Sequence, residues 1–238
     1  MMAQAFPMHV IARIHSDFPS KFGIPRQSGL VDTLRATIVF EPEYRNPDAL
    51  RGLEEFSHIW LIWQFSKAMR EDWSPTVRPP RLGGNTRIGV FATRSPFRPN
   101  ALGLSSVRLD RVELHGEHGP VLHVSGADLM DGSPIYDIKP YVAYTDAHPN
   151  AACSFAQPLD SAQLRVNFPD TLIRRIPEDR REALIAVLAQ DPRPAYQNAP
   201  ERIYGFIFAG IEIRFTVKGH TLIVCEVTPN RAETGKES

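Results

Sequence analysis

Two polar loops contain the residues whose types and spacing suggest chemistry. In residues 89–105, an apolar segment leads into a loop that holds Arg94, Arg98 and Asn100 around two prolines. Proline restricts the backbone, so these polar groups are held in place at a low entropic cost. An arginine fork binds phosphate or carboxylate through two hydrogen bonds. We therefore expect a binding site here, to which a second loop adds Pro25, Arg26 and Gln27.

Two carboxylates lie close together farther along the chain. Asp128 and Asp131 belong to a turn that continues into Gly132 and Ser133. Carboxylates at this spacing have the chemistry to accept hydrogen bonds from a ribose diol or to bind a metal ion. The alternative is an Asx turn that only shapes the backbone. Both interpretations remain open from the residues alone.

A third group follows directly after this turn. Asp137, Lys139 and Tyr141 alternate along the chain, so an extended backbone would point all three side chains to one face. Polar groups at the edge of an apolar barrel are costly unless they are paired or solvated. The pattern predicts either a catalytic group or an ion pair of purely structural value.

The charge distribution points to a partner that the total charge conceals. The 238-residue chain has 27 basic and 27 acidic residues, and a net charge of zero argues against a nucleic-acid ligand. Between Asp72 and Asp110, however, there is no acidic residue and no lysine. Arginine grips phosphate and stacks on bases in ways that lysine does not. We read this stretch as a candidate RNA surface formed by Arg78, Arg81, Arg87, Arg94, Arg98 and Arg108.

Several common classes of protein are excluded by what the sequence lacks. No G-x-G-x-x-G or P-loop motif is present, so a nucleotide bound in the usual βα manner is not expected. Cys153 and Cys225 are too few for a disulfide framework or a zinc site, and we predict no metal. The longest apolar run, residues 59–63, is far shorter than a membrane span. We therefore expect a cytoplasmic protein without a membrane partner.

The elements that must position these residues are mostly strands. Residues 9–15, 30–40, 57–65, 87–93, 104–114 and 121–126 have strand-like patterns, and Asn46-Pro47 marks the start of a short helix that ends near Glu55. The apolar phase slips between Leu109 and Val112, which indicates a β-bulge. Short strands without βαβ alternation favour a mainly β fold, with an antiparallel barrel or sandwich in the first part of the chain.

A change in composition divides the chain. Residues 1–147 form the predicted barrel domain, residues 148–165 read as a linker, and residues 166–238 form a small α+β domain. In the last part, a helix begins at Pro177 and two strands follow over 211–217 and 221–227. Because this part is small, we expect it to pack on the barrel or to move relative to it, and to assist RNA binding.

Six segments in fixed order resemble the TrmO family, also called TsaA-like or YaeB-like proteins. The similarity also extends to residues 190–196, so it covers most of the chain. Ser66 and Ala101 depart from the family pattern, which has histidine and proline there. The six segments are residues 22–27, 56–60, 78–84, 89–100, 131–134 and 137–141.

The resemblance implies an enzyme that uses S-adenosylmethionine without a Rossmann domain. Family members are single-sheet β-barrels that act as homodimers, with the cofactor near the dimer interface. They methylate N6 of threonylcarbamoyl-adenosine next to the anticodon of threonine tRNA, so the expected partner is the anticodon stem-loop. Two alternatives stay open: a non-catalytic RNA-binding barrel, and a methyltransferase with another RNA or a small molecule as acceptor.

Site roles follow from combining the resemblance with the chemistry of the residues. Asp137 is the predicted base that removes the proton from the acceptor nitrogen, Lys139 stabilises the developing charge and Tyr141 positions the base. The RNA contacts are assigned to Arg78, Arg81, Arg87, Arg98, Asn100 and Arg193. The predicted cofactor contacts are Pro25, Arg26, Gln27, Phe65, Ser66, Arg94, Leu104, Asp128, Asp131, Gly132 and Ser133.

Overall fold

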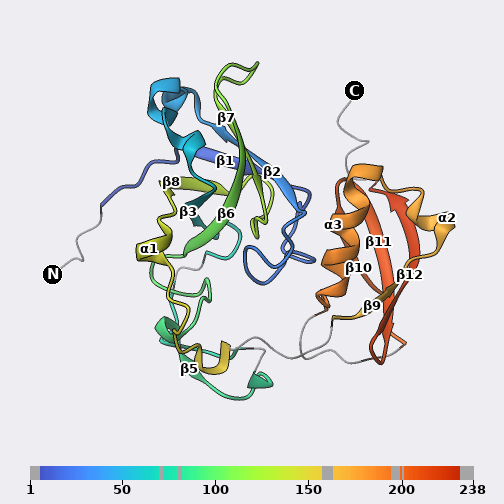
Figure 1. Cartoon of the computed structure of the whole chain (residues 1–238). Coiled ribbons are helices and arrows are strands. Elements are labelled where there is room, and N and C mark those ends of the chain that lie inside the picture. Colours follow the sequence, from blue (N-terminus) through green and yellow to red (C-terminus); the bar gives the residue numbers. More distant parts are fainter. Residues whose placement is uncertain are drawn as a thin grey trace.

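The protein consists of a closed β-barrel and a smaller second sheet that is covered by a helix (Figure 1). The computed structural model describes residues 6–69, 72–79, 82–156, 163–193, 199 and 201–230. Six antiparallel strands close the barrel, which confirms the predicted fold class. In barrel order they are β1 (Ala12–His15), β2 (Arg35–Phe40), β7 (Val121–Ser125), β6 (Leu102–Glu113), β3 (His58–Gln64) and β8 (Pro134–Pro140).

Strand β3 shows how the sequence pattern builds the barrel wall. Ile59, Leu61 and Trp63 are buried in the barrel interior, whereas Trp60 and Ile62 between them point outward. Alternate side chains of a strand face opposite sides, so the inward set packs with apolar residues from the other strands. The wall therefore has an inner and an outer face, and both carry residues of the predicted site.

Two irregularities bend the wall. The register of β6 against β7 shifts between Leu109 and Arg111, which confirms the bulge predicted from the slipped apolar phase. A second shift, between Ile62 and Trp63 against β8, was not predicted. It leaves Tyr136 as the extra residue of β8, beside the end of β3.

Two predicted elements differ in the structure. The helix expected from Asn46 to Glu55 is instead two 3-10 turns, Pro47–Leu50 and Leu53–Glu55, because Gly52 between them has a left-handed backbone with φ 86°. Asn46 nevertheless caps the first turn as predicted, and its side chain accepts from the Asp48 amide at 3.0 Å. The strand expected over 87–93 shortens to β5 (Ile88–Gly89), which pairs with β4 (Thr76–Val77) and leads into a 3-10 turn, Val90–Ala92.

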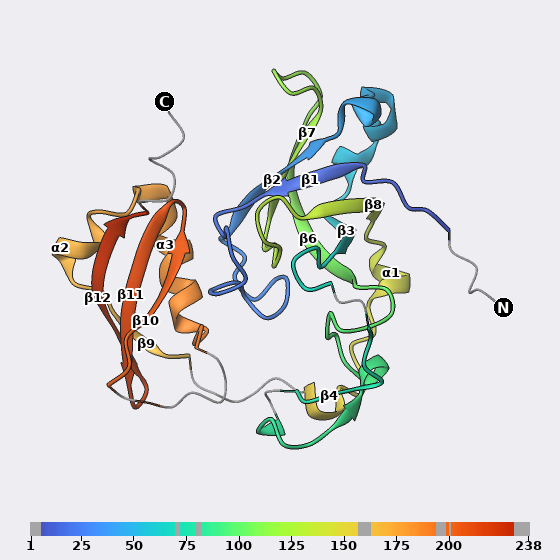
Figure 2. The same cartoon turned by 180° about the vertical axis from the view of Figure 1, so that it is seen from behind.

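The second unit is a four-stranded sheet with α3 packed on one face (Figures 1 and 2). Its order is β10-β11-β12-β9, and β9 pairs parallel to β12. The Pro177 helix start and both predicted strands are found. The bounds are β9 (Arg165–Asn167), β10 (Tyr204–Phe208), β11 (Ile211–Lys218), β12 (Thr221–Pro229), α2 (Asp170–Ile173) and α3 (Glu178–Ala189); α1 (Ala143–Asp146) follows the barrel.

The second unit shares its core with a barrel loop. Phe18, Val31 and Leu34, from the connection between β1 and β2, are buried in the same apolar cluster as Phe206 and Phe208 of β10. The second unit therefore packs on the barrel. Its contact surface is the loop that carries the predicted cofactor residues 25–27.

No helix in the described part of the chain is long and apolar enough to cross a membrane.

Candidate cofactor and RNA site

A hydrogen-bonded chain at one end of the barrel holds the carboxylate of Asp128. The indole N–H of Trp63 donates to Ser105 Oγ at 3.0 Å, and the Ser105 hydroxyl donates to Asp128 Oδ1 at 2.6 Å. Trp63 and Ser105 are both buried. The carboxylate is thus oriented by a rigid part of the barrel wall, although it lies on the connection after β7.

The loop around Gln27 lies against this carboxylate. The Gly29 amide donates to the Gly126 carbonyl at 2.9 Å, which docks the loop beside the residues after β7. Arg94 Nη1 donates to Gln27 Oε1, and Gln27 Nε2 donates to the Arg26 carbonyl at 2.6 Å. Three segments that are distant in sequence therefore meet at Asp128, Gln27 and Arg94, each of which the sequence analysis assigned to the cofactor. We call these three residues the acid cluster.

Burial dominates the electrostatics of Asp128. It raises the pKa of this carboxyl above the ordinary value, because a charged group is poorly solvated there. Hydrogen bonds from the Ser105 hydroxyl and from the backbone amides of Asp128 and Ser28 act in the opposite direction, as does the positive charge of Arg94. A buried, pre-oriented acceptor of this kind is suited to a ligand that brings its own donors.

Trp63, the first residue of the hydrogen-bonded chain to Asp128, also packs on a second aromatic ring. The Phe65 ring packs on Trp63 with centroids 4.3 Å apart. Gly103 permits this arrangement, because a Cβ at that position would lie 2.2 Å from the Trp63 ring. Phe65 is only half-buried. It is a predicted cofactor residue, and its packing on Trp63 joins it to the hydrogen-bonded chain that ends at Asp128.

Arg98 fixes the shape of the loop after β5. Its guanidinium donates to the carbonyl of Val90 at 3.0 Å, to that of Ser95 at 3.1 Å and to that of Thr93. The planar fork thus reaches three carbonyls of one loop, including that of Val90, which also accepts from the amide and the hydroxyl of Thr93. The Nε and Nη2 groups of Arg98 therefore hold the loop itself, which is a structural role that the sequence did not predict, and its contact with RNA remains a prediction.

A cavity of about 440 Å³ is lined by residues 96–100 of the same loop. Arg98 and Asn100 line it, as do Trp73, Gln64 and Tyr136. The bulge in β8 directs Tyr136 to this place, and its hydroxyl donates to Gln64 Oε1 at 2.5 Å. Residues 94–100 therefore contact the acid cluster at one end and line this cavity at the other.

The predicted catalytic group lies on the outer face of the barrel wall. Asp137 pairs with Ile62 in the register of β3 and β8, and Ile62 pairs with Leu104 of β6. Asp137 Oδ2 forms an ion pair with Lys139 Nζ at 2.8 Å, and its Oδ1 accepts from the Ile138 amide at 2.9 Å. Ile62, the partner of Asp137, is two residues before Gln64, which lines the cavity. The catalytic role of Asp137 remains a prediction.

Tyr141 has a packing partner that the sequence analysis did not assign. Its ring lies against Trp60 with centroids 5.5 Å apart, and it also contacts His58. The Trp60 indole in turn donates to Asp146 Oδ2 at 2.8 Å. This packing fixes the chain after β8, and nothing in it directs the Tyr141 hydroxyl at Asp137.

The structure separates Asp131 from Asp128. Asp131 Oδ1 accepts from the Ser16 amide at 3.1 Å and lies 3.4 Å from His15 Nδ1. Gly132 has φ 72° and turns the chain back toward β1, and Ser133 is buried. The Asp131 carboxylate thus binds the chain after β1, and the turn itself is closed by the Ser133 amide, which donates to the Met130 carbonyl at 3.1 Å, so these contacts are not those of the Asx turn considered as the alternative. The structure thus gives no support for predicted cofactor contacts at Asp131, Gly132 and Ser133.

The remaining predicted positions differ in exposure. Arg78, Arg87, Ser66, Leu104 and Arg26 are exposed, and Pro25 is buried. Arg193 is held by Asp191 through two hydrogen bonds of 2.8 Å and its side chain is only 12% exposed, so it offers little to RNA. Arg81 lies outside the described residues.

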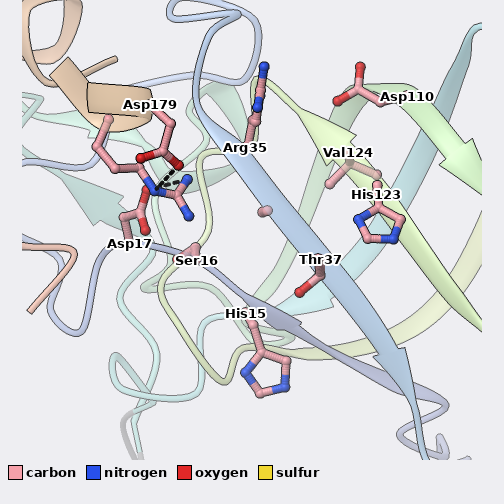
Figure 3. A pocket seen from close by; sticks show the side chains of 11 residues that line it. His15, Ser16, Asp17, Arg35, Thr37, Asp110, His123, Val124 and Asp179 are labelled. Atoms are coloured by element: carbon pink, nitrogen blue, oxygen red, sulfur yellow. Dashed lines mark ion pairs between the residues drawn. The ribbon is translucent and has the colours of Figure 1, made fainter. Parts of the chain in front are cut away.

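A second cavity, of about 370 Å³, lies where the barrel meets α3 (Figure 3). There Arg180 Nη1 forms an ion pair with Asp17 Oδ2 at 3.1 Å, and Arg180 Nε lies 3.6 Å from Asp179 Oδ2. Burial raises the pKa of Asp17, and this effect exceeds the opposing effect of Arg180. His15 and His123 also line this cavity, so its walls carry groups of both charges. The ion pair between Arg180 of α3 and Asp17 links the second unit to the barrel. Within the described residues, no group of three His, Cys, Asp or Glu side chains could hold a metal ion.

Sequence reasoning missed the residues that orient the site. Trp63 and Ser105 occupy ordinary strand positions, and Gln64 and Tyr136 become neighbours only through the bulge in β8. The one available signal was a serine at an inward position of an apolar strand. A buried hydroxyl there requires a partner.

Comparison with known proteins assigns the chain to a family. The tRNA-methyltransferase O N-terminal domain matches residues 13–147, and the TrmO C-terminal domain matches residues 161–230. The chain is 44% identical over 204 residues to the tRNA (adenine(37)-N6)-methyltransferase of Escherichia coli K12, covering 83% of this chain and 86% of that protein. It is 47% identical over 170 residues to the same-named protein of Eikenella corrodens, covering 71% and 95%. A crystal structure of TrmO from Pseudomonas aeruginosa superposes with a TM-score of 0.76 at 32% identity, covering 94% of this chain and 99% of that one. The chain belongs to the tRNA-methyltransferase O family.

Proposed function

We propose that this protein is an S-adenosylmethionine-dependent methyltransferase that modifies N6 of adenine 37 in tRNA. The names of its relatives support this activity. The observation that carries it in this chain is the loop of residues 94–100, which joins the acid cluster to a cavity of about 440 Å³. A two-substrate reaction requires two adjoining sites of this kind.

The chemistry of the acid cluster fits the cofactor. Asp128 accepts from the ribose hydroxyls, and Arg94 binds the carboxylate of the methionine part. The half-buried ring of Phe65 offers a face to the sulfonium cation. When bound, S-adenosylmethionine supplies an electrophilic methyl group. The role of the protein is then to position an acceptor nitrogen in line with it.

The cavity fits the acceptor nucleoside. Its walls combine the aromatic rings of Trp73 and Tyr136 with the amides of Asn100 and Gln64. Such walls bind an unstacked base through its faces and its polar edge. A carbonyl substituent on N6, as in threonylcarbamoyl-adenosine, makes this nitrogen a poor nucleophile until its proton leaves. Asp137 is our proposed proton acceptor, since it lies one strand row away on the same outer face.

The wider RNA contact is electrostatic. Arg78 and Arg87 are exposed in the stretch that lacks acidic residues, so they are available to the phosphates of an anticodon stem-loop. We also propose a homodimer, to be checked by light scattering, and the cytoplasm as the compartment where the tRNA is met.

A methyl-transfer assay tests the proposal. Purified protein is incubated with S-adenosylmethionine and with tRNA from a strain that lacks the modification, and the nucleosides are then analysed by mass spectrometry. We expect one added methyl group on N6 of adenine 37, and Asp137→Asn should lower kcat without changing cofactor affinity. RNA binding without transfer would indicate a non-catalytic barrel. Transfer to another nucleoside or to a small molecule would refute the proposed acceptor.

A further inference from the structure

Two exposed aromatic rings stack on each other beside the proposed acceptor cavity. Trp73 and Phe91 have ring centroids 6.0 Å apart and planes inclined by 26°. Trp73 is 48% exposed and Phe91 is 73% exposed. Large apolar side chains that gather on a surface mark an interaction site more often than single exposed ones do. We call these two residues the aromatic platform.

The surroundings of the platform are basic. Val77 and Ile88 form the last pair of β4 and β5, and Arg78 directly follows the one while Arg87 directly precedes the other, so both arginines flank the same end of this ladder. Neither arginine has an ion pair or hydrogen bond to any residue that the structure describes, and neighbouring like charges repel each other. An external anion would relieve this repulsion. The nearest carboxylate along the chain is that of Asp72, next to Trp73.

The platform is joined closely to the proposed site. Arg94 follows Phe91 by three positions, and even a fully extended chain of three residues spans only about 10 Å. The Val90 amide donates to the Pro75 carbonyl at 2.9 Å, and Arg98 binds the Val90 carbonyl, so the turn that carries Phe91 is fixed on both sides. Both views show β4 and β5 projecting away from the barrel (Figures 1 and 2). Trp73 itself also lines the cavity.

We propose that the aromatic platform binds an unpaired base of the tRNA loop that flanks the modified adenosine, with Arg78 and Arg87 on its phosphates. This rests on the proposed function. Aromatic faces accept any base by stacking, and flanking arginines neutralise the backbone, which is the combination that single-stranded RNA requires. A neutral protein or an apolar peptide would gain nothing from the two unpaired arginines.

The test compares the binding of a fluorescent anticodon stem-loop with that of a duplex RNA of equal length. We expect Phe91→Ala and Trp73→Ala to weaken stem-loop binding roughly fivefold to hundredfold, and Trp73→Phe to restore most of it. The matched control is Tyr144→Ala, because Tyr144 is an 89% exposed aromatic residue of α1. Arg78→Gln should reduce the salt dependence of binding, whereas Phe91→Ala should leave it unchanged. Cofactor affinity and melting temperature should not change in any variant.

The outcomes separate this proposal from the proposed function. If the wild type methylates tRNA while Phe91→Ala, at a residue that does not line the cavity, binds the stem-loop normally, the platform has no role and the function stands. If the wild type does not methylate but both variants lose stem-loop binding, the platform stands and the function fails. Light scattering on the same samples tests a third possibility, that the two rings form a contact between copies of the protein. A change in oligomeric state that accompanies the loss would assign the two rings to a contact between copies and overturn the proposal.

Discussion

Replacing Gly103 with alanine should disturb the acid cluster without touching it directly. Gly103 lies on the inner face of β6, and its missing Cβ makes room for the Trp63 indole. An alanine Cβ would meet three indole atoms at 2.2 to 2.6 Å, which is far inside van der Waals contact. Trp63 is 5% exposed and is enclosed by the barrel core, so it has no free space to move into. We therefore expect the displaced indole to distort the hydrogen bond that Trp63 donates to Ser105.

The size of the effect follows from these contacts. Overpacking a core costs about 1–3 kcal/mol, and for a chain of this size each kcal/mol lowers the melting temperature by roughly 2–4 °C. We therefore expect the melting temperature to fall by roughly 2–12 °C. If Ser105 no longer orients Asp128, a hydrogen bond to a charged group is lost, which is worth about 1.5–3 kcal/mol. Cofactor affinity should then fall roughly tenfold to hundredfold.

Thermal melting and calorimetry with S-adenosylmethionine measure both effects. Gly89→Ala is the matched control, because a Cβ at Gly89 would meet no atom within 4 Å and the backbone there is not left-handed. Trp63→Phe should reduce the stability cost of Gly103→Ala, since the smaller ring leaves room for the methyl group. If Gly103→Ala melted like Gly89→Ala and bound the cofactor normally, the proposed coupling through Trp63 would be wrong.

Three further changes test other parts of the structure. Arg180→Ala should cost roughly 1–3 kcal/mol more in urea unfolding than Asp17→Asn, because it leaves a buried carboxylate without its partner. This difference should shrink as the pH falls through the raised pKa of Asp17, since the protonated carboxyl is neutral, and a pH-independent difference would contradict the assignment. Arg98→Lys should cost about 1.5–3 kcal/mol and weaken both cofactor and RNA binding, because an ammonium cannot span three carbonyls; equal affinities in the variant would argue against a loop-fixing role. Ending the chain at residue 156 should abolish cofactor binding in calorimetry, because it exposes Phe18 and its neighbours in the loop of Gln27; retained binding would show that the barrel needs no second unit.

Alternation and turn chemistry predicted a mainly β fold but left a barrel and a sandwich open, and the resemblance to the TrmO family indicated the closed barrel that the structure shows. The pattern of Ile59, Leu61 and Trp63 gave the inner face of β3, and the slipped phase near Leu109 gave the bulge. Local backbone conformation was not predictable to the same degree. Gly52 splits a predicted helix because its left-handed conformation depends on packing that a helical pattern does not reveal.

The cofactor contacts named from the sequence remain predictions, but the structure brings three of them together. Gln27, Arg94 and Asp128 lie close to one another, although no spacing rule relates three segments so far apart in sequence. Arg98 and Asp131 were assigned to ligands because an isolated arginine or carboxylate looks available in a sequence. Carbonyl and amide groups of the backbone occupy them in the structure, and a sequence pattern contains no information on such groups.

Calorimetric titration with S-adenosylmethionine of two matched variants tests the central claim most directly. Asp128→Asn and Asp131→Asn make the same chemical change three residues apart, one in the acid cluster and the other on Ser16 and His15. We predict that Asp128→Asn loses roughly tenfold to hundredfold in affinity, that Asp131→Asn binds like the wild type, and that both melt as folded proteins. Wild-type affinity should also decline as the pH falls through the raised pKa of Asp128. Full affinity in Asp128→Asn, or an equal loss in Asp131→Asn, would contradict the placement of the cofactor at this end of the barrel.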